Sequence, residues 1–153
     1  MKNKPILIVA GEPKSVFFEI LFKSYKSYKI KSPLIIIASK NLLLSQIKKF
    51  KFKKEIRSLD FQNFKNDELD NKKINLIDIK TSFRGNFKNN YIENSFDVAF
   101  RLIKKGLTYK LINGPIKKTE FPLIFASPPT IALSSAYFLS PCKRTILSNI
   151  LLM

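Results

Sequence analysis

A short loop near the start of the chain has residue types that could hold an anion. Gly11, Glu12 and Pro13 follow an apolar run and come just before a helical pattern. A helix that starts after such a turn directs its free backbone N–H groups toward a bound phosphate or carboxylate. The same three residues are equally typical of a plain turn, so this loop alone does not define a site.

A second loop, residues 113–118 (NGPIKK), has a richer set of polar groups. Asn113 offers an amide, and Gly114 allows a ligand to approach the backbone closely. Lys118 could meet a phosphate or carboxylate as a mobile point charge. Taken alone, the segment is also compatible with a tight turn flanked by two solvated lysines.

Several other chemistries are excluded by what the sequence lacks. The chain has no histidine, the commonest acid–base group at neutral pH and the commonest metal ligand. Its four glycines form neither a P-loop nor a dinucleotide-binding fingerprint. Cys142 is the only cysteine, so an internal disulfide is impossible and a cytoplasmic location is expected. We assign no catalytic residue and no metal ligand.

Strand and helix patterns alternate through the first 113 residues. Apolar runs predict strands at residues 6–10, 34–38, 74–79 and 107–113, with a shorter strand at 56–59. The strand at 107–113 leads into the second loop. Apolar residues at helical spacing predict helices at 16–25, 41–50 and 91–105. Residues 81–90 look turn-rich, and Gly106 is placed to end the last helix.

This alternation predicts an α/β fold, with a parallel or mixed sheet and helices on both faces. In such sheets, ligands bind at the carboxyl ends of the strands. The two loops follow the first and last predicted strands, so we expect them at the same edge.

The net charge of +17, from 28 basic and 11 acidic residues, suggests a polyanionic partner. Only four basic residues are arginines, and the lysines are scattered along the first 118 residues. Nucleic acid is therefore not the expected partner, and no membrane association is expected. A small basic module that binds nucleic acid or an acidic partner stays open as the alternative function.

Taken together, the loops and the helix before the second loop resemble the amino-terminal part of 4-hydroxythreonine-4-phosphate dehydrogenases. In that family the first loop reads Gly-Asp/Glu-Pro-Ala-Gly-Ile-Gly-Pro-Glu, and the second reads Thr-Gly-Pro-x-Asn/His-Lys. The matching residues here are Gly11, Glu12, Pro13, Glu19, Gly114, Pro115 and Lys118. The glycine-rich middle of the first loop is missing, and Asn113 replaces the threonine. The resemblance covers residues 4–118.

The resemblance implies part of an isocitrate/isopropylmalate-dehydrogenase-like fold and a homodimer. It also implies NAD-dependent oxidation of a phosphorylated hydroxy-amino acid in pyridoxal phosphate biosynthesis, followed by decarboxylation at a divalent metal. The family's metal ligands are histidines, which this chain lacks. The family's substrate-binding His-Thr pair falls at residues 129–134 (PTIALS), again without histidine.

The composition changes after residue 120. Residues 121–153 contain no Asp or Glu, two of the 28 basic residues and four of the eight prolines. A membrane segment, a short carboxy-terminal strand and helix, and a truncated or frameshifted ending are three interpretations. We expect the third, with residues 1–120 as the α/β part, 121–153 as an atypical tail, and the chain inactive as it stands.

Overall fold

The computed structural model describes residues 3–63, 69–80 and 87–117, with only the backbone for residues 87–90. Residues 118–153 lie outside this part, so the predicted tail and the boundary at residue 120 stay predictions. The helices are α1 (Phe17–Ser27), α2 (Lys40–Lys49) and α3 (Phe87–Lys104). The strands are β1 (Ile6–Val9), β2 (Leu34–Ala38), β3 (Ile56–Ser58), β4 (Ile74–Asp78) and β5 (Leu111–Asn113).

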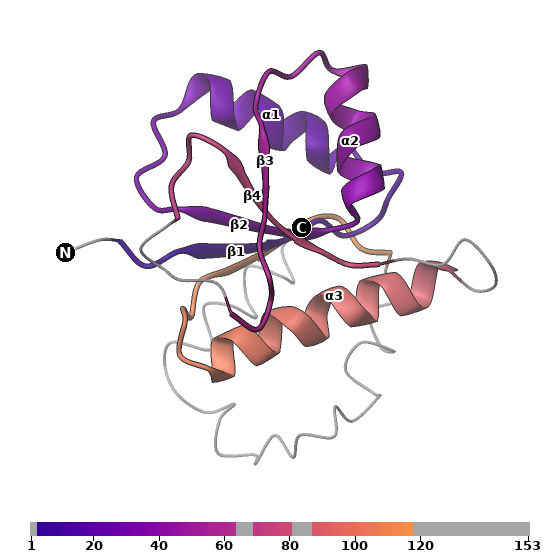
Figure 1. The fold of residues 1–153 in the computed structure, drawn as a ribbon. Helices are drawn as coiled ribbons and strands as arrows, with labels where there is room; N and C mark the ends of the chain where they lie inside the picture. The colour runs from indigo at the N-terminus through magenta and orange to yellow at the C-terminus, as the bar shows by residue number, and fades with distance from the viewer. Residues whose placement is uncertain (1–2, 64–68, 81–86, 118–153) are drawn as a thin grey trace.

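The five strands form one sheet in the order β3-β4-β2-β1-β5, and every pairing is parallel. Helices α1 and α2 cover one face of the sheet, and α3 covers the other (Figure 1). The predicted α/β class is therefore confirmed, and the sheet is parallel rather than mixed. None of the helices in the described ranges is long and apolar enough to cross a membrane.

Alternation along the central strands builds a core on each face. In β2, Leu34, Ile36 and Ala38 point toward α1 and α2, whereas Ile35 and Ile37 point toward α3. All five residues are buried because both faces of a parallel sheet are covered by helices. The continuous apolar run that predicted a buried strand reflects this two-sided covering.

Two predicted element boundaries are wrong by more than two residues, and several others differ by one or two. Helix α3 begins at Phe87, four residues before the predicted start and inside the region expected to be turn-rich. Strand β5 covers only Leu111–Asn113 instead of residues 107–113. The Thr108 hydroxyl accepts a hydrogen bond from the Lys110 backbone N–H at 3.1 Å, and this local turn delays the strand.

Gly106 ends α3 as predicted, with φ at 76°. Its N–H donates to the Ile103 carbonyl at 3.0 Å, and the Leu107 N–H donates to the Leu102 carbonyl at 3.2 Å. This pair of bonds is the Schellman ending, which places a glycine in the left-handed conformation just past the helix.

Tyr25 on α1 gives the fold an alkaline pH dependence. Burial raises the pKa of its hydroxyl to about 12, and the oxygen has no hydrogen-bond partner among the described residues. The folded chain holds this proton more tightly than the unfolded chain. The resulting stability is complete below pH 10, the ordinary value, and is lost as the pH rises toward 12.

We expect Tyr25→Phe to be as stable as the parent at pH 7, or more stable by up to about 1 kcal/mol, because it removes an unsatisfied buried hydroxyl. Between pH 10 and 12 the parent should lose about 2 kcal/mol relative to the variant. Urea unfolding of both chains across this range measures the difference, in which the lysine titrations cancel. If the free energy of unfolding changed with pH in the same way in both chains, the raised pKa of Tyr25 would be contradicted.

Candidate functional site

The two loops meet where β1 and β5 end. The register pairs Val9 with Asn113, so the strands finish side by side. The chain leaves β1 toward α1 on one face, whereas it reaches β5 from α3 on the opposite face. Neighbouring strands with connections on opposite faces define a topological switch point, the usual ligand position in open α/β sheets.

Backbone hydrogen bonds join the loops directly. The Gly114 N–H donates to the Val9 carbonyl at 2.7 Å, and the Glu12 N–H donates to the Pro115 carbonyl at 2.9 Å. A Cβ atom on Gly11 would lie 2.5 Å from the Pro115 oxygen, and one on Gly114 would collide with the Ala10 carbonyl. The glycines therefore allow the two backbones to touch, and the space that was expected to admit a ligand is filled by the other loop.

The polar side chains of the site have local partners. The Asn113 amide nitrogen donates to the Gly114 carbonyl at 3.1 Å, which shapes the turn. The Ser15 hydroxyl accepts the Phe17 N–H at 3.4 Å at the start of α1. Lys117 is exposed, and Lys118 lies outside the described residues. The structure thus brings five of the predicted residues together and does not place the sixth.

Three residues at this edge, Ser39, Asp78 and Tyr91, were missed by sequence reasoning. An Asp78 carboxylate oxygen accepts the Lys40 N–H at 2.8 Å, and the Tyr91 hydroxyl accepts the Ser39 N–H at 3.4 Å. These contacts cap α2 from β4 and α3, since Ser39 makes no side-chain cap of its own. Burial raises the pKa of Tyr91 to about 12, so its hydroxyl is protonated at neutral pH. No sequence motif marks caps that come from distant elements.

A divalent metal is not accommodated by the described residues. No three His, Cys, Asp or Glu side chains gather anywhere in that part of the chain. The loops also leave no open glycine cradle for a dinucleotide pyrophosphate, because Gly11 and Gly114 face each other's backbone. We therefore derive no reaction step through a metal or a nicotinamide.

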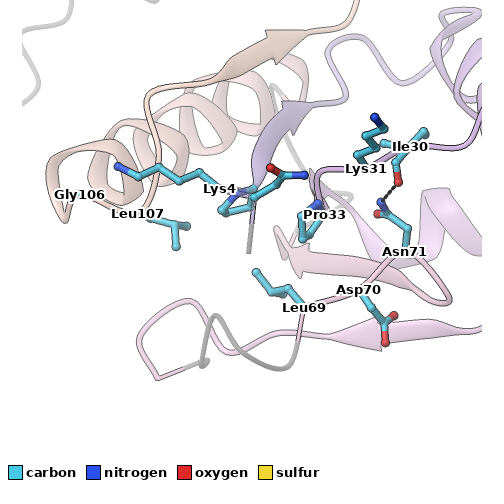
Figure 2. A pocket seen from close by; sticks show the side chains of 11 residues that line it. Lys4, Ile30, Lys31, Pro33, Leu69, Asp70, Asn71, Gly106 and Leu107 are labelled. Carbon is cyan, nitrogen blue, oxygen red and sulfur yellow. Dashed lines mark hydrogen bonds between the residues drawn. The ribbon is translucent and has the colours of Figure 1, made fainter. Parts of the chain in front are cut away.

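A hollow of about 490 Å³ lies at the opposite, amino edge of the sheet. Figure 2 shows it between the residues that precede β1, β2 and β4, with Leu69, Leu107 and Pro33 among its walls. The Asn71 side chain there accepts the Leu34 N–H at 3.0 Å and donates to the Ser32 carbonyl at 2.8 Å. These bonds hold the loop between α1 and β2 in place, so Asn71 has a structural role.

Known proteins resemble this chain in structure and not in sequence. No protein-family model matches it, and no curated protein is significantly similar in sequence. The 4-hydroxythreonine-4-phosphate dehydrogenase of Klebsiella pneumoniae superposes with a TM-score of 0.64 at 18% identity, over 83% of this chain and 42% of that one. The Burkholderia phymatum enzyme gives 0.63 at 16% identity, over 77% and 38%.

The likeness establishes a shared fold. The five-stranded parallel sheet and three helices match part of the dehydrogenase structures, which confirms the expected partial isocitrate-dehydrogenase-like fold. The chain spans about two fifths of their length.

Proposed function

We propose that this chain forms the amino-terminal part of a 4-hydroxythreonine-4-phosphate dehydrogenase-like protein, in which the switch-point edge holds the phosphorylated substrate. The observation that carries the proposal is the direct pairing of the Gly11 and Gly114 loops. These loops contain the family-like residues, and two solved structures that share this fold are enzymes of that name.

The substrate phosphate would lie on the solvent side of the paired loops, because their inner sides are in mutual contact. Lys117 is exposed beside the second loop, and Lys118 follows it. Both can attract a phosphate as point charges. The proposal includes the homodimer that the resemblance implies and the cytoplasmic location expected from the single cysteine. NAD-dependent oxidation belongs to such a protein as a whole, since the described residues fit neither the cofactor nor the metal.

Calorimetric titration of the 153-residue chain with 4-hydroxythreonine 4-phosphate tests this function. We expect saturable binding that needs the phosphate, so unphosphorylated 4-hydroxythreonine should not compete. We also expect no NADH formation when NAD⁺ and Mg²⁺ are added, because the chain has no histidine ligands.

The double variant Lys117→Gln/Lys118→Gln should weaken phosphate binding about tenfold. Lys104→Gln/Lys110→Gln, which removes two exposed charges away from the loops, is the matched control and should bind like the parent. Equal affinity for the phosphorylated and unphosphorylated compounds, or an unchanged affinity in the double variant, would refute the proposed site.

A further inference from the structure

Residues 20–54, which span most of α1 and all of β2 and α2, carry positive charge and contain no acidic residue. This segment has ten lysines and no arginine. The acidic residues at its two borders are already paired, Glu19 with Lys23 at 2.7 Å and Glu55 with Lys73 at 2.6 Å. Lys54 also has a partner, since its ammonium group donates to the Asn71 carbonyl. The excess of like charge in the segment is self-repulsive, and an anionic partner would relieve that repulsion.

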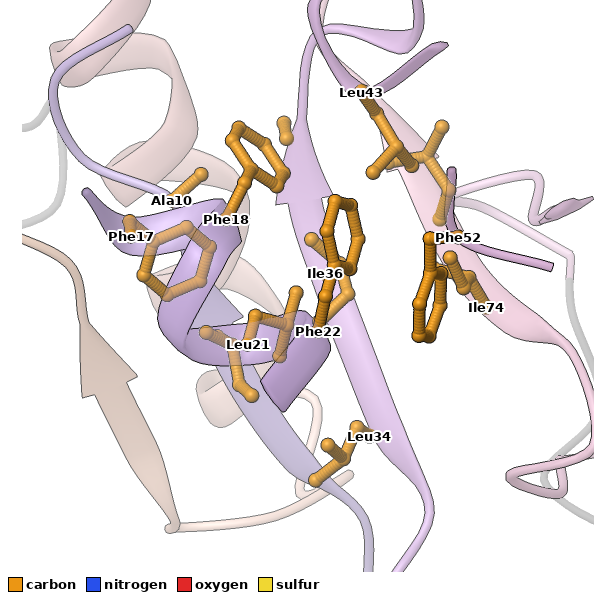
Figure 3. Packing of buried hydrophobic residues seen from close by; sticks show 13 residues of the cluster. Ala10, Phe17, Phe18, Leu21, Phe22, Leu34, Ile36, Leu43, Phe52 and Ile74 are labelled. Carbon is orange, nitrogen blue, oxygen red and sulfur yellow. The ribbon is translucent and has the colours of Figure 1, made fainter. Parts of the chain in front are cut away.

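An aromatic cluster brings several of these lysines together. Phe22 of α1 stacks on Phe52, with 4.4 Å between the ring centroids (Figure 3), and Phe22 also contacts Phe50 at 6.0 Å. Lysine ammonium groups lie over three rings of the cluster: Lys26 over Phe52 at 6.0 Å, Lys49 over Phe50 at 5.2 Å and Lys54 over Tyr25 at 4.3 Å.

Three further lysines at the end of α2 and just after it are exposed: Lys48, Lys51 and Lys53. Together with those over the rings they form what we call the basic patch: Lys26, Lys48, Lys49, Lys51, Lys53 and Lys54. Two of the six, Lys48 and Lys49, lie in the last turn of α2 and complement its dipole. That role does not account for the lysines beyond the helix end. Five of the six lie within residues 48–54, and the fold adds Lys26 of α1, whose ammonium group lies over the Phe52 ring.

Lys51 occupies a position at which glycine would be less strained. Its φ is 48°, in the left-handed region. Its N–H donates to the Lys48 carbonyl at 3.3 Å, and the Phe52 N–H donates to the Ile47 carbonyl at 3.0 Å. This is the same Schellman ending that Gly106 provides for α3. A lysine here keeps a charge within the patch at the cost of backbone strain.

We propose that the basic patch binds the phosphodiester backbone of nucleic acid without regard to sequence. Lysines suit phosphate contacts, and no arginine lies within residues 20–54 to read base edges. A membrane surface is a poorer fit, because Phe22 and Phe52 are buried beneath the lysines and cannot insert into lipid. This lysine cluster answers one of the two reasons for not expecting nucleic acid, the scatter of the lysines, and the absence of arginine from the segment fits binding that does not read base edges.

Fluorescence anisotropy with the full chain and a labelled 20-nucleotide oligo(dT) measures this binding. We expect affinity to fall steeply between 50 and 200 mM salt. The triple variant Lys49→Gln/Lys51→Gly/Lys53→Gln should bind at least tenfold more weakly at 100 mM salt. The slope of log affinity against log salt should become shallower by about 2, as expected for three lost phosphate contacts on a single strand.

The matched control removes the same charge elsewhere: Lys72→Gln/Lys104→Gln/Lys110→Gln, all exposed and outside the patch. It should lose less than twofold in affinity. The single variant Lys51→Gly checks that weaker binding does not come from unfolding. It should raise the melting temperature by about 4 °C while lowering affinity, since glycine relieves the strain but removes the charge.

Equal losses in the two triple variants would show that net charge alone drives binding, and they would overturn the proposal. An unchanged affinity in the patch variant, or no binding by the parent chain, would do the same. Tighter binding to phosphatidylserine vesicles than to oligo(dT) would reassign the patch to a membrane surface.

Discussion

Alanine in place of Gly11 is expected to lower the free energy of unfolding by about 3 kcal/mol. Two costs add at this position. The backbone has φ at 69°, which disfavours any residue with a Cβ atom, and that atom would lie 2.5 Å from the Pro115 carbonyl oxygen. Neither backbone can move away without breaking the Glu12–Pro115 hydrogen bond. Urea unfolding followed by circular dichroism measures the loss.

Gly106→Ala separates the two costs. Gly106 has a similar φ of 76°, but a Cβ atom there would meet nothing within 4 Å. We expect this variant to lose only about 1 kcal/mol, the cost of the left-handed conformation alone. The difference between the two variants then measures how tightly the loops pack at the switch point. Similar losses in both would show that the loop contact contributes little to stability.

Phe22→Ala is expected to destabilise the domain by about 4 kcal/mol. The ring is 3% exposed and joins α1 to the segment after α2 through its contacts with Phe50 and Phe52. Its removal leaves a cavity between α1 and the segment after α2. Among the described ring pairs, Phe22 and Phe52 have the shortest distance between centroids, at 4.4 Å. Chemical unfolding should show an earlier midpoint with an unchanged dependence on denaturant concentration.

Ile20→Ala is the control on the same helix. Ile20 is 57% exposed, so its truncation removes little buried surface, and alanine is the better helix former. Its stability should stay within about 0.5 kcal/mol of the parent. A loss comparable with that of Phe22→Ala would mean that the outer side of α1 is covered in solution.

The order and type of the elements could be predicted because each buried strand is short, apolar and followed by helical spacing. Residues 34–38 are apolar throughout, and the structure makes them the central strand β2 with the predicted bounds. Gly106 marks the end of α3 for a local reason that sequence shows directly. Such features depend on neighbours within a few residues.

Features that depend on distant partners could not be predicted. Strand β5 begins at Leu111 instead of residue 107 because of the Thr108 turn. Its position beside β1 joins two parts of the chain that are far apart in the sequence. The mutual contact of Gly11 and Gly114 depends on this position as well. Asn75 is wholly buried within β4, where its amide donates to the Leu34 and Asp70 carbonyls, and the apolar pattern gave no sign of this role.

The pairing of β5 with β1 has a consequence for how the chain folds as it is synthesised. Leu7 pairs with Leu111, so nearly the whole described chain must emerge before this contact forms. Until then β1 is an unprotected edge and the Gly11 loop lacks its partner. Closing so long a loop is entropically costly and slow, so we expect it to be the final step. A nascent chain halted after β4 would therefore contain the core under α1 and α2, but it would lack α3 over the other face and the partner strand that completes the switch point.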